Sequence, residues 1–176
     1  CSSDLRFGYR RVLTAGQIET GVGAFLAALE ASGYDGPWTQ PEGLARQNLV
    51  LRLSDGPAGE GYALTLMAYQ AQWTATEHVP ARAIEAGEIG RFGALSAHDG
   101  GRTHRLALSG EWGRGTADGR MQGSLYAVDY GLNLFSNPSG FISGPQGDQH
   151  EQVDGRRVLG GQVRRDWYVG DATAGG

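Results

Sequence analysis

The chain has 176 residues and a formal net charge of −4, and its 30 glycines contrast with two methionines and one cysteine. No basic run could neutralise a series of phosphates, so nucleic acid is excluded as an expected partner. The lone cysteine, Cys1, excludes an internal disulfide and a CxxC metal pair. Glycine together with 9% aromatic residues favours strands and turns over packed helices, so we expect a mostly β protein.

The first residues, 1–5, are expected to be a non-native or frayed start, and residues 6–176 to form one domain. Two special interpretations of 1–5 stay open beside an ordinary frayed terminus. Cys1 could be the lipidated first residue of a mature lipoprotein, or the segment could be a translation artefact. We favour the artefact and expect the natural protein to extend further at this end.

Alternation of apolar with polar or small side chains predicts about seven strands. The predicted strands are 5–13, 17–29, 45–54, 60–73, 103–112, 120–135 and 156–168. Between 103 and 112, Leu106, Leu108 and Trp112 share one face, opposite Arg105 and Glu111. The strand at 60–73 carries bulky side chains on both sides, so its faces are not assigned.

Three other predicted strands have the same two-residue period. In 45–54, Leu49, Leu51 and Leu53 lie opposite polar residues that include Arg52, and in 156–168 an apolar face lies opposite Arg156 and Arg164. In 17–29, Ile18, Val22, Ala24, Leu26 and Ala28 are expected on one face. The strand at 120–135 is expected to carry its bulk on the face of Tyr126, Val128, Tyr130, Leu132 and Leu134.

The predicted connections alternate between short and long. The short ones are 14–16, 55–59 and 113–119, and the long ones are 30–44, 74–102 and 136–155. An up-and-down barrel of the outer membrane has this order, because tight periplasmic turns and long extracellular loops lie at opposite rims. A Greek-key sandwich gives no reason for it.

Three tryptophans, Trp73, Trp112 and Trp167, lie near predicted strand ends. Amphipathic indole rings collect in girdles at the two lipid–water boundaries of a membrane barrel. The same tryptophans could instead cap the core of a soluble β protein. We expect an aromatic girdle because the strand and loop patterns point the same way.

Several blocks resemble the barrel of TonB-dependent receptors. They are W-T-A-T-E-H-V-P-A-R-A-I, G-E-I-G-R-F-G and D-G-G-R-T-H-R-L-A-L-S-G-E-W between 73 and 112, then Y-A-V-D-Y-G-L-N-L-F-S-N-P and G-P-Q-G-D-Q-H-E-Q-V-D-G-R-R-V-L-G-G between 126 and 161, and G-Y-D-G-P-W, R-Q-N-L-V-L-R-L-S and L-T-L-M-A-Y-Q-A-Q-W between 33 and 73. The chain departs from the family at 138–140 and at His150, which puts the substrate in doubt.

The resemblance implies a transmembrane antiparallel barrel of about 22 strands, of which this chain would supply about seven. It implies location in the outer membrane of a Gram-negative cell, contact with outer-membrane lipid, and a plug domain inside the barrel. It also implies coupling to the TonB energy-coupling complex through a part outside this chain. The extracellular ligand would be a scarce small molecule such as a ferric siderophore, a cobalamin or a glycan.

Residues that could carry chemistry are few, and we expect no enzyme and no cofactor. No G-x-S-x-G, H-E-x-x-H or P-loop string occurs. Asp148, His150, Glu151 and Asp154 form an oxygen-rich candidate for calcium, although a solvated loop beside two arginines explains them better. His78 and His98, with Glu77 and Asp99, match no zinc spacing and are expected in a hydrated loop.

The arginines expected on the inner wall are the candidates for ligand or plug contact. They are Arg52, Arg105, Arg156 and Arg164, with Arg6 and Arg10 near the start of the chain. Charge on the inner face of a barrel costs little, so any of them could equally be a hydrated wall residue.

A second hypothesis stays open beside the receptor. The chain could be a soluble or lipid-anchored β-sandwich or lipocalin-like binding module, anchored through Cys1. The two hypotheses differ in what the apolar faces contact: lipid in the receptor, and one another in the module.

Overall fold

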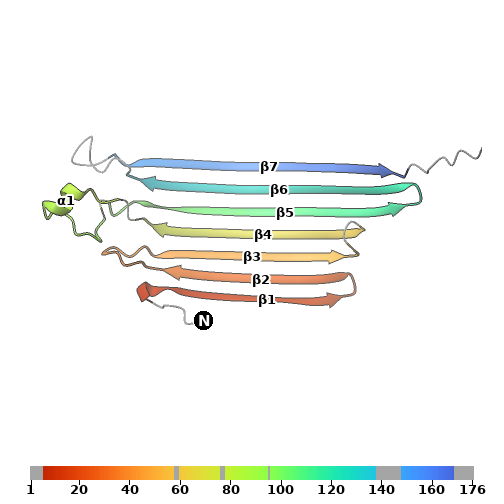
Figure 1. Ribbon diagram of the computed structural model, residues 1–176, viewed down its shortest axis with the longest axis horizontal. Helices are drawn as coiled ribbons and strands as arrows, with labels where there is room; N and C mark the ends of the chain where they lie inside the picture. The colour runs from red at the N-terminus through yellow and green to blue at the C-terminus, as the bar shows by residue number, and fades with distance from the viewer. Residues whose placement is uncertain (1–5, 58–59, 76–77, 95, 138–147, 169–176) are drawn as a thin grey trace, which may run out of the picture.

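A computed structural model describes residues 6–57, 60–75, 78–94, 96–137 and 148–168 as one antiparallel sheet of seven strands (Figure 1). The strands are β1 (Arg10–Thr20), β2 (Gly23–Tyr34), β3 (Leu44–Asp55), β4 (Gly61–Thr74), β5 (Gly100–Thr116), β6 (Gly119–Ser136) and β7 (His150–Trp167). A 3-10 turn, η1 (Arg6–Gly8), precedes β1, and a five-residue helix, α1 (Ala81–Glu85), lies between β4 and β5. The predicted all-β class is confirmed.

The strands pair in the order of the chain, each with the next, as an up-and-down sheet. Within the described residues the sheet does not close, and β1 and β7 each have a free edge. Because every pair is antiparallel, β1 and β7 run in the same direction. The up-and-down topology is confirmed, while a closed membrane barrel stays a prediction.

The alternation of short and long connections is also confirmed. The short connections are 21–22, 56–60 and 117–118, and the long ones are 35–43, 75–99 and 137–149. All long connections leave from the end of the sheet where α1 lies, here called the loop end, and all short ones from the opposite turn end (Figure 1).

At the turn after β5, a hydrogen bond from the Thr116 hydroxyl and the nearby Arg165 guanidinium lower the pKa of Asp118.

The first hairpin differs from its prediction. The turn expected at 14–16 lies inside β1, and the chain reverses at Gly21 and Val22 instead. The Thr20 hydroxyl holds this turn by donating to the Gly23 carbonyl at 2.6 Å, and Gly23 has a φ of 115°, which favours glycine. The predicted strand 17–29 is therefore two strands, and Ile18 and Leu26 lie on opposite faces.

Other boundaries were also predicted wrongly, and β5 extends from Gly100 to Thr116 rather than from 103 to 112. Residues 6–8 form η1 rather than a strand, and Phe7 there adopts a φ of 59°. The last strand begins at His150, six residues before the predicted start, because β6 continues to pair with it as far as Ser136.

The pairing register assigns every strand residue to one of two faces. The "apolar face" contains Leu49, Leu66, Leu108, Leu125 and Leu159, and the "mixed face" contains residues such as Arg52, Tyr69, Arg105, Tyr126 and Arg164. The faces predicted for β3, β5 and β7 are correct. In β6 the bulky row that includes Tyr126 lies on the mixed face, whereas Leu125 and Ala127 continue the apolar face.

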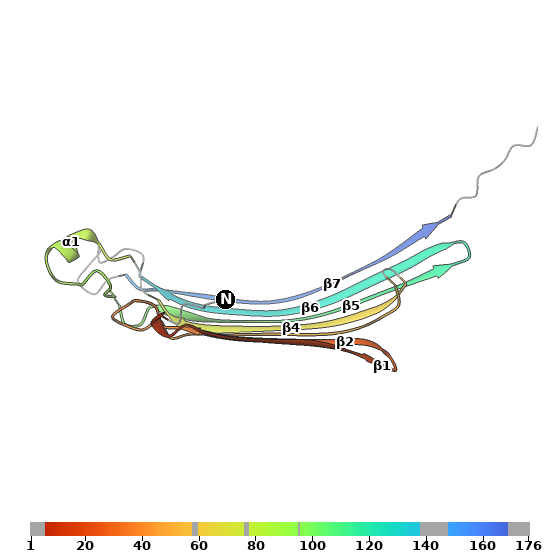
Figure 2. The same cartoon turned by 60° about the horizontal axis from the view of Figure 1, so that its bottom comes forward.

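The sheet is strongly curved along its strands, and the strands bend together (Figure 2). Among the described residues the only buried hydrophobic side chains are Ala63, Ala71 and Ala83. Leu159, by contrast, is 83% exposed. The sheet therefore has no conventional core of its own. No described helix is long and apolar enough to cross a membrane.

Glycines opposite aromatic rings account for part of the high glycine content. Gly101, Gly123, Gly131 and Gly160 each pair with a ring residue on the neighbouring strand, and a Cβ at any of them would meet that ring. The four rings belong to Trp73, Trp112, His104 and Tyr126, respectively. The ring covers the bare glycine backbone, an arrangement that helps to fix strand register.

Candidate functional site

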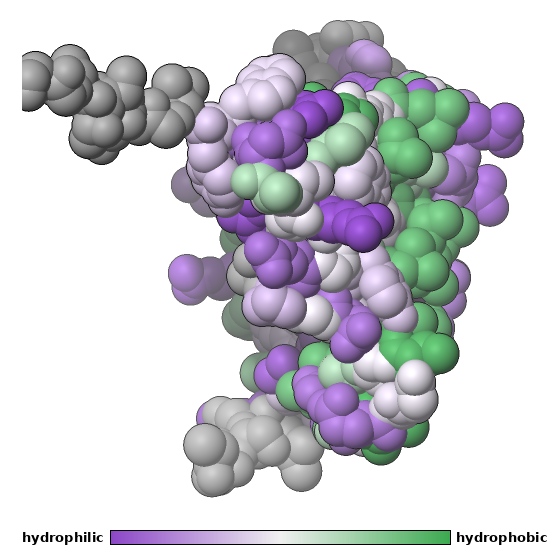
Figure 3. Space-filling view, turned by 90° about the vertical axis from the view of Figure 1, so that its right-hand side faces the viewer, coloured by the Kyte–Doolittle hydropathy of each residue, from purple (hydrophilic) through white to green (hydrophobic). Residues whose placement is uncertain are grey.

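An apolar band crosses the apolar face from β1 to β7. One row, read across the hydrogen-bonded pairs, consists of Gly16, Ala27, Leu51, Leu66, Leu108, Ala127 and Leu159. The neighbouring row toward the turn end consists of Ile18, Phe25, Leu53, Leu64, Gly110, Leu125 and Gly161. Figure 3 shows hydrophobic side chains gathered on one side of the sheet and polar ones on the other.

The band contains no charge, and many of its side chains are open to the surroundings. Leu125 is 71% exposed and Ile18 is 63% exposed. Along β5 the band extends from Leu106 to Trp112, about 20 Å at ~3.3 Å per residue. Contiguous exposed apolar surface on this scale marks a contact with another apolar phase or partner.

The band crosses the strands obliquely. Its polar border at the loop end is marked by Arg10 on β1, Gln47 on β3, His104 on β5 and Arg157 on β7. Successive strand pairs connect Arg10 on β1 to Val153 on β7 in one row across the sheet. The polar border starts in this row at β1 but lies at Arg157 on β7, four residues further along that strand. That displacement is about 13 Å across about 29 Å of sheet, using ~3.3 Å per residue and ~4.8 Å per strand spacing.

The polar border at the loop end contains a hollow that we name the rim hollow. Its polar lining is Gln47, Gln70, Gln72, Arg102, Thr103, His104, Asn133 and Asp154, and its volume is about 610 Å³. Gln70 donates to Gln47 at 2.8 Å, and the His104 ring lies 3.3 Å from the Asp129 carboxylate. The two-residue period predicts His104 on this face but does not reveal the hollow, because Gln47 and Gln70 come from strands about 20 residues apart.

Aromatic residues mark the border of the band at the turn end. Tyr62 and Trp112 are directly paired on the apolar face, and Trp167 lies beyond them on β7. The Tyr62 hydroxyl donates to the Val22 carbonyl, and the Arg165 guanidinium lies 5.3 Å from the Trp167 ring centroid. Trp112 and Trp167 thus lie on the apolar face toward the turn end, and an aromatic girdle stays a prediction.

Trp73 differs from the other two predicted girdle residues. It belongs to the mixed face at the loop end of β4, where it pairs with Gly101. Successive residues of a strand point to opposite faces, so the position of Trp73 along β4 sets its face. Residues 60–73 carry bulky side chains at both odd and even positions, so the sequence does not show which face is which.

The mixed face carries all four arginines predicted for an inner wall. Arg52 donates to the Thr65 hydroxyl at 3.0 Å, Arg156 pairs with Asp154 at 2.6 Å, and Arg164 pairs with Asp166 at 2.9 Å. Of the other two early arginines, Arg10 lies on the apolar face and Arg6 in η1. The four wall arginines are spread over β3, β5 and β7 rather than gathered in one cluster.

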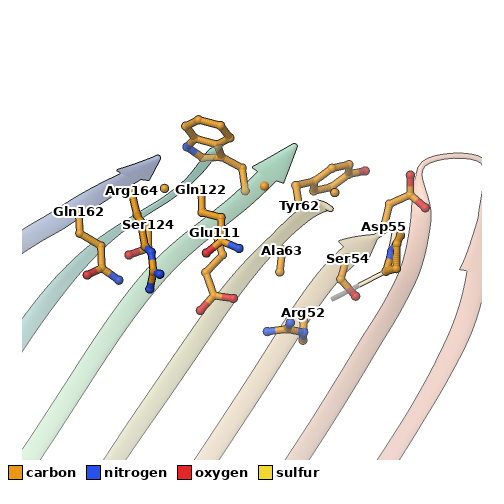
Figure 4. A pocket seen from close by; sticks show the side chains of 16 residues that line it. Arg52, Ser54, Asp55, Tyr62, Ala63, Glu111, Gln122, Ser124, Gln162 and Arg164 are labelled. Carbon is orange, nitrogen blue, oxygen red and sulfur yellow. The ribbon is translucent and has the colours of Figure 1, made fainter. Parts of the chain in front are cut away.

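A shallow hollow of about 630 Å³ lies near the turn end of the mixed face. Arg52, Glu111, Ser124, Gln162 and Arg164 line it from strands β3, β5, β6 and β7. Figure 4 shows Arg52 and Glu111 pointing to the same side of the sheet while Tyr62 points away. The surface presents both charge signs with neutral donors and acceptors, which suits a hydrated wall or a polar protein partner.

A second polar network on the mixed face is centred on Glu30. Its carboxylate accepts from Arg11 at 2.8 Å, from Arg46 at 3.5 Å and from Asn48 at 3.4 Å. The three donors come from β1 and β3, so Glu30 on β2 joins three strands.

Replacing Glu30 by Gln should loosen the β1 edge, because Arg11 and Arg46 would lose their shared carboxylate. We expect a loss of about 1 kcal/mol or less, the range for partly exposed ion pairs. Hydrogen exchange of the β1 amides measures it, with Glu19→Gln on the same face as the control. If the β1 amides were equally protected from exchange in both variants, the Glu30 network would not be what holds the β1 edge.

The predicted calcium candidate is divided by the strand that contains it. On β7, His150 and Asp154 belong to the mixed face and Glu151 to the apolar face. Asp154 is paired with Arg156, and Glu151 accepts from Asn133 at 2.9 Å. Among the described residues no group of three or more His, Cys, Asp or Glu side chains gathers for a metal ion.

The long connection before β5 places Asp99 in a polar junction. Asp99 is only 2% exposed, and one of its carboxylate oxygens accepts from Gln149 at 2.9 Å. Its backbone carbonyl accepts from Ala75 at 2.8 Å. Asp99 thus ties this connection to the start of β7, and Glu77 lies outside the described residues.

Comparison with known proteins gives no match to a protein-family model, a curated protein or a solved structure.

Proposed function

We propose that the chain is a section of an outer-membrane barrel wall of the TonB-dependent receptor type, acting in energy-coupled uptake of a scarce solute. The carrying observation is the uncharged apolar band, which crosses seven strands on one face and has no covering layer among the described residues. Lipid is the partner whose chemistry fits a band of this extent. Its height of about 20 Å approaches the roughly 25 Å apolar band of outer-membrane barrels.

The obliqueness of the band supports the same proposal. Strands in a closed barrel tilt by roughly 35–45° from its axis, so a bilayer of uniform thickness cuts across the hydrogen-bonded rows at an angle. The border that moves from Arg10 to Arg157 has a slope of roughly 25° from the strand spacings given above. A soluble sandwich core gives no reason for such a slope.

The opposite face supports a water-filled or plug-filled interior. Arg52, Arg105 and Arg164 lie there beside neutral polar side chains. Charges on a lumen wall stay hydrated, whereas the same charges inside a sandwich core would need full pairing. The ligand class, the plug and the TonB energy-coupling complex rest on the resemblance of the sequence blocks.

The test is the partition of the purified 176-residue chain between buffer and phosphatidylcholine vesicles in a flotation gradient. We expect the chain to aggregate in buffer and to float with the vesicles as strand structure, measured by circular dichroism. A soluble monomer that melts cooperatively without lipid or detergent would contradict the proposal. That outcome would favour the soluble binding module.

A further inference from the structure

We propose that the rim hollow binds the phosphate group of a membrane lipid, with Arg102 as its anchor. The inference rests on the proposed function, because it takes the apolar band to lie in the bilayer. It adds a lipid site that the barrel wall alone does not require. The occupant is a lipid because the hollow opens at the polar border of the band, where a bound headgroup would leave its acyl chains along Leu106 and Leu49.

Arg102 is the strongest hydrogen-bond donor of the hollow. It is exposed on the apolar face of β5, and no ion pair from it is found in the described part of the chain. A guanidinium binds phosphate oxygens through parallel N–H groups, which matches a lipid phosphate in both charge and shape. The His104 ring and the amides of Gln47 and Gln72 add donors around the same hollow.

The nearby carboxylates are engaged by other groups. Asp129 accepts from Arg157 at 3.1 Å and lies 3.3 Å from the His104 ring, and Glu151 accepts from Asn133 at 2.9 Å. Asp154 also lines the hollow and is paired with Arg156 at 2.6 Å. None of these three carboxylates forms an ion pair with Arg102 in the described part of the chain. The guanidinium therefore keeps its charge available for an anion at this border.

Two glycines leave space for a headgroup beside the rim hollow. Gly131 pairs with His104, and Gly155 follows in the same row on β7. The His104 ring lies over Gly131, and a Cβ at Gly155 would meet nothing within 4 Å. At Gly155 the surface of β7 is therefore not covered by a side chain, and it lies next to the polar donors of the rim hollow.

The experiment compares Arg102→Gln with Arg114→Gln, a matched control on the same strand and face but at the turn end. Flotation is measured with vesicles of phosphatidylcholine alone and with vesicles that also contain phosphatidic acid. We expect phosphatidic acid to strengthen binding of the unchanged chain. In Arg102→Gln the increase in binding caused by phosphatidic acid should be about fivefold smaller, the effect of one cation near an anionic surface. In Arg114→Gln the increase should be reduced by less than about twofold.

The outcomes separate the two proposals. If the unchanged chain fails to float with phosphatidylcholine alone, the membrane proposal fails. If it floats but both variants lose the gain equally, or neither does, the Arg102 site is overturned while the membrane proposal stands. If inorganic phosphate at a concentration matching the lipid phosphate abolishes the gain, the hollow is a soluble-anion site and the lipid assignment is overturned.

Discussion

Replacing Leu159 by Arg is expected to weaken insertion into phosphatidylcholine vesicles by about 1–2 kcal/mol, between the cost of arginine on the lipid face near an interface and that at the bilayer midplane. Leu159 lies in the apolar band, two residues from the border at Arg157, and is 83% exposed, so in the proposed barrel the new guanidinium would face hydrocarbon. The partition constant, obtained from a lipid titration, should fall by roughly five- to thirtyfold.

The control for this substitution is Val158→Arg. Val158 is the preceding residue and is also an exposed aliphatic side chain, but it lies on the mixed face. We expect insertion of this variant to stay within about threefold of the unchanged chain, since lumen-facing substitutions carry little cost. Equal losses in the two variants would show that the faces do not differ in what they contact, and the membrane proposal would be rejected.

Replacing Gly160 by Val should destabilise the inserted sheet by about 1–3 kcal/mol, the usual cost of overpacking. A Cβ at Gly160 would meet the ring of Tyr126 on β6, so the ring would have to leave the bare backbone that it covers. Urea unfolding of the vesicle-bound chain, followed by tryptophan fluorescence, measures the change.

Gly155→Val is the matched control for Gly160→Val. Gly155 lies on the same strand, a Cβ there meets nothing within 4 Å, and its φ is not in the left-handed region. A β-branched residue favours an extended strand, so this variant should be neutral or slightly more stable. A loss of stability at Gly155 as large as that at Gly160 would mean that β7 tolerates no side chain, whatever the ring above it.

The sequence alone was sufficient to predict the strands, and the faces of those strands, wherever the two faces differ in chemistry. Leu49, Leu51 and Leu53 lie on one side of Arg52, so a two-residue period fixes both the element and its face. The loop order could be predicted for a related reason, because polar and glycine-rich segments separate these strands at two different lengths.

The errors have physical causes that a single strand does not reveal. The chain reverses at Gly21 and Val22, but the side chains on each side of this turn continue to alternate, so a tight hairpin looks like one strand. His150 starts β7 although the residues around it are polar, because backbone pairing with Ser136 extends the ladder beyond the apolar band. The rim hollow depends on the register of five strands and could not be predicted from any one of them.

The common direction of β1 and β7 limits how the sheet can be completed. In the proposed barrel, a closed ring of antiparallel strands alternates up and down, so the strands that join β7 back to β1 would be odd in number. A second copy of this seven-strand sheet satisfies that parity only when it is inverted, with its long connections at the opposite rim. If every long connection is to face the same side of the membrane, a second copy of this sheet alone would not close the proposed barrel.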